Sequence, residues 1–222
     1  MLYVVMEQCK NAEKTYNIFV QDVTCAPERM AVLCNGQQLG DIARFCCDPF
    51  NFSILGIDPT FNLGEFSVTP TVYRHLLLSD RRTGRSPPLL GPMLVHYHKH
   101  FRNYNYFLST LIGLKREIEH VNAVGTDGEK NLVDAVIRNF PHVSHIRCFR
   151  YLQQNIEMHL RDQQFPSNVV KKYTHDIFGW SETDGSYHEG LVDCRDIESF
   201  NTCLEALKPK WDSLLERNAF ED

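Results

Sequence analysis

The order of apolar patterns along the chain constrains its fold more than any other feature. From residue 52 onward, three segments have the apolar spacing of strands, and the segments after them alternate between helix and strand. Strands joined by short turns pair antiparallel, whereas strands separated by a helix favour parallel pairing. The predicted strands are 52–57, 65–78, 89–98, 121–126 and 145–149, and the predicted helices are 104–120, 129–140 and 151–164.

This order, β-β-β-α-β-α-β-α, predicts an α/β fold with a mixed sheet and matches the ribonuclease-H-like architecture. We expect this core over residues 51–165. Residues 1–50 form an N-terminal lead-in segment, with strands at 15–23 and 30–34, a strong turn at Asn35-Gly36 and a short helix at 38–45. Residues 166–222 form a polar helical extension with helices at 167–178 and 196–216. Pro70, inside the second core strand, indicates an edge strand or a bulge.

The composition and net charge of the chain exclude several classes of protein. The 222 residues contain 23 Lys and Arg against 28 Asp and Glu, a net charge of −5, which excludes a nucleic-acid binder that relies on a dense basic surface. No apolar stretch approaches the roughly 20 residues of a membrane helix, so we expect no membrane partner. The eight cysteines are scattered, without a C-x-x-C pair, and are typical of reduced, mostly buried thiols in an intracellular protein.

Two aspartates at the ends of predicted strands are candidate metal ligands. Asp58 and Asp127 each follow a short apolar strand, and if the first and fourth core strands are neighbours the two carboxylates meet at the strand ends. Hard oxygen ligands of this kind suit Mg²⁺ or Mn²⁺, and a pair of such ions supports phosphodiester chemistry. For each Asp taken alone, a turn or helix-start residue is the favoured interpretation. The pair in this strand order favours the metal site instead.

The same residues resemble the transposases of Mutator-like elements (MULEs), DDE-type enzymes that cut and join DNA. The matching segments are Ile57-Asp58-Pro59-Thr60-Phe61, Thr126-Asp127-Gly128-Glu129-Lys130-Asn131-Leu132, Phe140-Pro141 and Cys148. The resemblance covers roughly residues 50–160. It implies that Asp58 and Asp127 are the first two acids of the catalytic triad, that Mg²⁺ or Mn²⁺ is the cofactor, and that transposon-end DNA is the substrate. It also implies that residues 166–222 begin the helical insertion of that family, with a nuclear location.

Two departures from the family pattern bear on activity. The family's Cys-x-x-His element is here Cys148-Phe-Arg-Tyr151, with Tyr in place of His. The third acid of the family lies in a Glu-Ser-x-Asn segment after the insertion, which we expect beyond the end of this chain. Ile197-Glu198-Ser199-Phe200-Asn201 has those letters, so Glu198 is a candidate third ligand, although a solvated residue near a helix cap is the favoured interpretation.

Two weaker clusters complete the candidates. His96, His98 and His100 have the spacing of one strand face, a possible zinc arrangement, but an exposed polar cluster is the favoured interpretation. Arg81, Arg82 and Arg85, in a Gly/Pro hinge, are candidate contacts to a DNA backbone or simply solvated loop residues.

Three hypotheses remain. The first is a MULE-like transposase catalytic domain that cleaves and transfers DNA strands, active only weakly if its third acid is missing. The second is a catalytically silent, domesticated derivative that acts as a DNA- or protein-binding module. The third is an unrelated ribonuclease-H-like nuclease with its own third acid. The sequence leaves open the DNA ends recognised, the formation of a homo-oligomer and the retention of activity.

Overall fold

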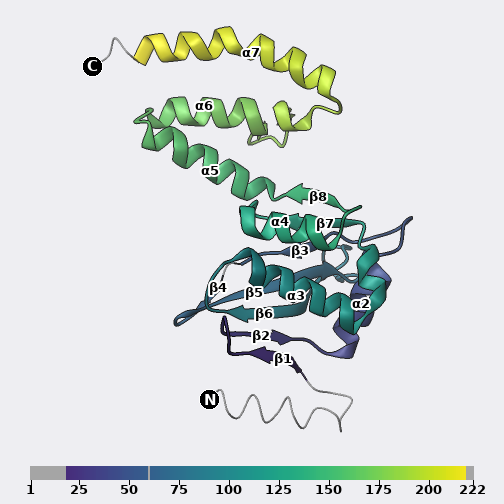
Figure 1. The fold of residues 1–222 in the computed structure, drawn as a ribbon. Coiled ribbons are helices and arrows are strands. Elements are labelled where there is room, and N and C mark those ends of the chain that lie inside the picture. The colour runs from purple at the N-terminus through teal and green to yellow at the C-terminus, as the bar shows by residue number, and fades with distance from the viewer. Residues whose placement is uncertain (1–18, 60, 219–222) are drawn as a thin grey trace. The chain divides into compact units, whose positions relative to one another are not determined.

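A computed structural model describes residues 19–59 and 61–218 of the chain (Figure 1). Its contacts divide the chain into two compact units, Met1–Cys148 and Phe149–Asp222. The predicted boundaries at residues 50 and 165 remain predictions. No helix in the described part of either unit is both long and apolar enough to cross a bilayer.

The first unit is built on one mixed sheet of eight strands. They lie in the order β1-β2-β6-β5-β3-β7-β8, and β4 pairs with β5. The β3–β7 and β7–β8 pairs are parallel, and the other pairs are antiparallel. This confirms the predicted mixed α/β class. The strands are β1 (Val20–Thr24), β2 (Met30–Leu33), β3 (Leu55–Ile57), β4 (Phe61–Leu63), β5 (Phe66–Arg74), β6 (Pro88–His96), β7 (Ala123–Thr126) and β8 (Ser144–Arg147).

Three helices lie together over one face of this sheet: α2 (Gly36–Cys46), α3 (Phe101–Leu114) and α4 (Lys130–Asn139) (Figure 1). Their apolar stripes meet the inward side chains of the strands, and each large side chain so buried stabilises the fold by about 1.5–3 kcal/mol. Fully buried members of this core include Ile42, Leu94, Phe107, Val124 and Val136. The core therefore fixes the strand ends that carry the candidate site.

The second unit is mainly helical, as predicted, with one short hairpin that the sequence patterns did not indicate. Its core centres on Val169 and Tyr173, packed against Leu160, Phe165 and Trp211. The elements are α5 (Phe149–Asp162), α6 (Ser167–Phe178), β9 (Trp180–Ser181), β10 (Tyr187–His188), the 3₁₀ helix η3 (Leu191–Asp193) and α7 (Ile197–Asn218).

The Asn35-Gly36 pair starts a helix, which corrects the predicted turn. The Asn35 side chain accepts a hydrogen bond from the Gln38 backbone N–H at 2.9 Å, and the Gln38 side chain accepts one from the Asn35 N–H at 3.0 Å. This reciprocal pair is a capping box, which Gln at the third helical position makes possible. Of the predicted strand at 15–23, residues 15–18 lie outside the described part of the chain, and the observed strand β1 begins at Val20.

Pro70 lies at a bulge, which was one of the two alternatives predicted for it; the other was an edge strand. It is not at an edge, because β5 lies between β3 and β6, but the β5–β6 register shifts between Pro70 and Val72. Proline has no N–H to donate to a ladder, so an irregularity at this position is expected.

Two further expectations need correction. The helix predicted at 104–120 is split, because α3 ends at Leu114 and a 3₁₀ helix, η2 (Arg116–His120), follows it. The cysteines are less buried than predicted: of the seven in the described residues, Cys34 and Cys46 are buried, whereas Cys25 and Cys203 are exposed. Burial raises the pKa of Cys34 to about 12, so this thiol is chemically inert at neutral pH.

Candidate functional site

The sheet brings Asp58 and Asp127 side by side. β3 and β7 are parallel neighbours, with Ile57 opposite Thr126, so the next residue on each strand is an aspartate. Partners on neighbouring strands lie about 5 Å apart, which allows the two carboxylates to share a ligand. Both residues are half-buried, and the Asp58 N–H donates to the Pro70 carbonyl at 3.3 Å. The predicted juxtaposition of these strand ends is therefore present.

Asp127 also shapes the loop that leads into α4. Its Oδ1 accepts a hydrogen bond from the Glu129 N–H at 2.9 Å, and the Gly128 N–H donates to Thr126 Oγ1 at 3.1 Å. Gly128 has φ of +91°, a backbone conformation that side chains with a Cβ rarely adopt. Asp127 therefore lies in the turn before α4, whose N-cap is Glu129, and the turn hydrogen bond uses one of the two Asp127 carboxylate oxygens.

Glu129 is a third acid at this edge, and the sequence patterns did not single it out. It is half-buried and accepts a hydrogen bond from the Tyr104 hydroxyl at 2.9 Å. Burial, and then the negative charge of Asp127, raise the pKa of Glu129. Its position two residues after Asp127, inside the segment already noted, was the available signal.

Lys99 supplies a positive charge beside these acids. Its ammonium donates to the Pro59 carbonyl at 2.8 Å, and its own carbonyl accepts from the Asn131 side chain at 2.9 Å. The Lys99 charge lowers the pKa of Glu129, opposing the effect of burial. Three acids and one lysine leave the site acidic, which favours a cation.

The acids do not form a tight three-ligand cluster. Across residues 19–59 and 61–218, the group of three or more metal-ligating side chains whose ligand atoms lie within 4.8 Å of one another is Glu28, His98 and His100. Asp58, Asp127 and Glu129 therefore form a looser arrangement, suited to an ion that keeps several waters, as Mg²⁺ does.

Glu198 lies in the other unit. It is exposed in the first turn of α7, where Asp196 Oδ1 accepts a hydrogen bond from the Ser199 N–H at 2.7 Å. These contacts are typical of a helix start. They agree with the favoured interpretation of Glu198 as a solvated residue near a helix cap. Glu198 as a third ligand stays a prediction.

The Cys-x-x-His position spans the division between the units. Cys148 is half-buried at the end of β8, and its N–H donates to the Thr126 carbonyl at 2.7 Å. Tyr151 is half-buried in the first turn of α5. Cys148 therefore borders the strand that carries Asp127.

The three arginines are exposed in the β5–β6 hairpin, where Asp80 orders the turn through hydrogen bonds from the Arg82 and Thr83 N–H groups. β5 runs antiparallel to β3, so this hairpin lies at the end of the sheet opposite Asp58. The structure does not bring Arg81, Arg82 and Arg85 together with the carboxylates.

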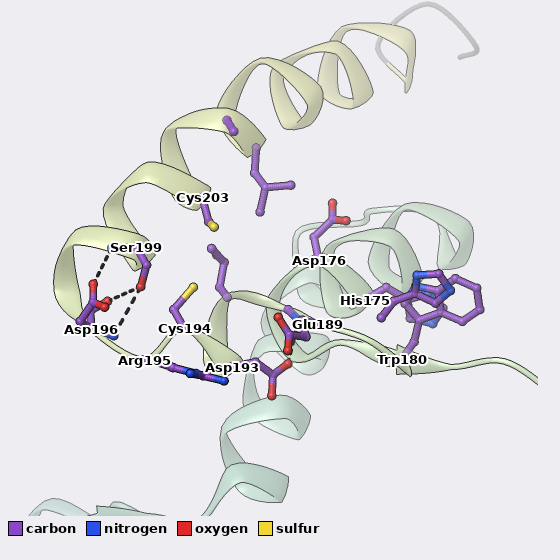
Figure 2. Close-up of a pocket in the computed structure, with 15 residues that line it drawn as sticks. His175, Asp176, Trp180, Glu189, Asp193, Cys194, Arg195, Asp196, Ser199 and Cys203 are labelled. Carbon is purple, nitrogen blue, oxygen red and sulfur yellow. Dashed lines mark hydrogen bonds between the residues drawn. The ribbon is translucent and has the colours of Figure 1, made fainter. Parts of the chain in front are cut away.

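The second unit contains a cavity of about 790 Å³, bounded by α6, the β9–β10 hairpin, η3 and α7 (Figure 2). The Trp180 ring stacks between His175 and His188, with ring centroids 5.2 and 4.3 Å away. Two of its acids already have partners, because Asp176 accepts from Trp211 at 3.0 Å and Asp193 accepts from the Gly190 N–H at 2.8 Å. The carboxylate edge of the sheet is the stronger candidate, because the pairing of β3 with β7 places Asp58 and Asp127 at the ends of adjacent strands.

Comparison with known proteins finds no family model and no curated protein that matches this chain. The resemblance to MULE transposases therefore rests on the quoted segments alone.

Proposed function

We propose that this chain is a MULE-like DNA transposase catalytic domain of ribonuclease-H-like fold, in which Asp58 and Asp127 bind Mg²⁺ or Mn²⁺ for DNA strand cleavage and transfer. The observation that carries the proposal is the parallel pairing of β3 and β7, which places both aspartates at one edge of the sheet. The order β6-β5-β3-β7-β8, three antiparallel strands followed by two parallel ones, supports the fold assignment.

The donor set fits such an ion. Carboxylate oxygens are the ligands that Mg²⁺ and Mn²⁺ prefer, and Oδ1 of Asp58 is a buried oxygen atom at this edge. When bound, the ions supply an activated attacking oxygen and stabilise the leaving one. The chain itself positions the ligands: the β3–β7 ladder fixes the two backbones, and the Gly128 turn orients Asp127.

Glu129 is the residue of this chain that best serves as a third acid. Its hydrogen bond from Tyr104 fixes the side chain, and burial, followed by the nearby charge of Asp127, raises its pKa. This observation makes Glu129, rather than Glu198, the third acid of the proposed site. DNA is the proposed partner, and a nuclear location follows from the same proposal.

A catalytically silent derivative is the second candidate, favoured by a specific observation. The three acids are not gathered within 4.8 Å, and one oxygen of Asp127 is used by the backbone of the loop. In that case the fold persists as a DNA- or protein-binding module.

A nicking assay on supercoiled plasmid DNA with Mn²⁺ tests the function. We expect slow nicking by the wild type, reduced at least tenfold in Asp58→Asn and in Glu129→Gln. The control is Asp134→Asn, which removes a half-buried carboxylate on α4 that pairs with Lys130 outside the site. Nicking equal in Asp58→Asn and the wild type would contradict the proposed function. An absence of nicking by a folded wild type that binds Mn²⁺ would favour the silent derivative.

A further inference from the structure

A second cluster lies at the start of β2, apart from the aspartates. The Glu28 carboxylate has only 5% of its side chain exposed. His98 Nδ1 lies 2.9 Å from Oε2 of Glu28, and His100 Nδ1 lies 3.3 Å from Oε1. The two imidazoles stack, with ring centroids 4.9 Å apart and an angle of 18° between the ring planes. Two ring nitrogens thus converge on one buried carboxylate.

The chain folds this way because β6 ends at His96. The His96 ring is fully buried, with Nε2 2.8 Å from Thr69 Oγ1 and Nδ1 2.7 Å from the His98 carbonyl oxygen. The Asn103 side chain donates to that same carbonyl at 2.7 Å. The predicted single face of three histidines is therefore wrong: His96 belongs to the core, while His98 and His100 follow the strand and turn toward Glu28.

The side chain of Lys99, which lies between His98 and His100 in the sequence, points away from Glu28. Its ammonium contacts the Pro59 carbonyl beside Asp58, so the loop presents alternate residues to two different sites. The carboxylate edge offers oxygen ligands only, whereas Glu28, His98 and His100 offer two nitrogens and one oxygen. The two donor sets suit different metals.

We propose that Glu28, His98 and His100 form a binding site for a transition-metal ion of the Zn²⁺ class, distinct from the Mg²⁺ or Mn²⁺ site. Imidazole nitrogen and carboxylate oxygen are standard Zn²⁺ ligands at about 2.0–2.2 Å, and three protein ligands leave a fourth position for water. Their three ligand atoms already lie within 4.8 Å of one another. Tetrahedral Zn²⁺ needs them roughly 3.3 Å apart, as follows from those bond lengths.

The neighbouring charges are compatible with a cation. Arg102 is ion-paired with Oε1 of Glu28 and the Asn103 side chain donates to Oε2 at 3.5 Å, so both are outer partners that orient the ligating carboxylate. The Arg102 side chain is 53% exposed, so solvent screens its positive charge from the ion. His98 and His100 are about half-exposed, with room to shift onto the metal. A bound ion would join the start of β2 to the β6–α3 loop.

Co²⁺ is the probe for this site, because its visible absorption reports ligand type and geometry. We expect the wild type to bind Co²⁺ at this site with four- or five-coordinate d–d bands and no thiolate charge-transfer band, and Zn²⁺ to displace it. His98→Ala/His100→Ala should weaken Co²⁺ binding at least 100-fold, and Glu28→Gln at least tenfold.

Two controls isolate the site. His120→Ala/His142→Ala removes two exposed imidazoles elsewhere, and Asp58→Asn/Asp127→Asn removes the other candidate metal site; both should retain the Co²⁺ spectrum. A spectrum unchanged in His98→Ala/His100→Ala, a thiolate band, or no binding by folded wild type would overturn the proposal. None of these outcomes depends on nicking activity, so the transposase proposal is tested separately.

Discussion

The Asp127 side chain has one observed role, accepting a backbone hydrogen bond, and one proposed role, ligating a metal ion. Asn keeps an oxygen that can accept the Glu129 N–H bond, observed at 2.9 Å, whereas Ala removes the acceptor. Loss of one intramolecular hydrogen bond of this kind, in the turn before α4, costs about 1 kcal/mol. Asp127→Ala should therefore lower the free energy of unfolding by about 1 kcal/mol.

Two charge effects act on Asp127→Asn in opposite directions. Removing a negative charge near the N-terminus of α4 costs about 0.3–1 kcal/mol. It also relieves the repulsion with Glu129 that contributes to the raised pKa of that acid. Because these effects offset each other, we expect Asn to stay within about 0.5 kcal/mol of the wild type, in keeping with the retained acceptor.

Urea denaturation measures the stability of both variants, and calorimetric titration measures their Mn²⁺ affinity. Both should lose Mn²⁺ binding, whereas only Ala should lose stability. Equal destabilisation by Asn and Ala would refute the assignment of the hydrogen bond, and full Mn²⁺ affinity in Asn would refute the role of Asp127 as a ligand.

Two other predictions test the same loop. Gly128→Ala should cost about 1–2 kcal/mol because its φ is +91°, whereas Gly113→Ala, inside α3 with open space around it, should be neutral or stabilising; equal effects in urea denaturation would contradict this. Glu129→Gln should become more stabilising relative to the wild type between pH 4 and pH 8. The raised pKa of Glu129 means that its contribution to stability is present below its unfolded pKa and is lost as the pH rises through the folded pKa. Urea curves at both pH values measure the difference, and a pH-independent difference would argue against the raised pKa.

Local patterns predicted the elements well where one periodicity dominated. The Leu132 and Val136 stripe indicated α4, and the short apolar runs indicated β3 and β7 within a few residues of their observed bounds. The neighbouring positions of Asp58 and Asp127 were predicted on the condition that the first and fourth core strands are adjacent, as β3 and β7 are. Parallel strands end at the same edge of a sheet.

What the sequence did not predict depends on contacts between distant residues. Glu28 lies some 70 positions before His98, and nothing in the local pattern links them. The orientation of His96 was mispredicted because its burial depends on Thr69, which lies on a different strand. Glu129 was overlooked because its partner, Tyr104, lies on α3.

A calorimetric Mn²⁺ titration of the purified chain beside Asp58→Asn/Asp127→Asn tests the central claim most directly, with Asp134→Asn as the matched control. The proposed site predicts binding by the wild type and the control that is lost in the double variant while circular dichroism shows that it is folded. Equal Mn²⁺ affinity in the wild type and the double variant, or no binding by a folded wild type, would contradict a metal site between β3 and β7.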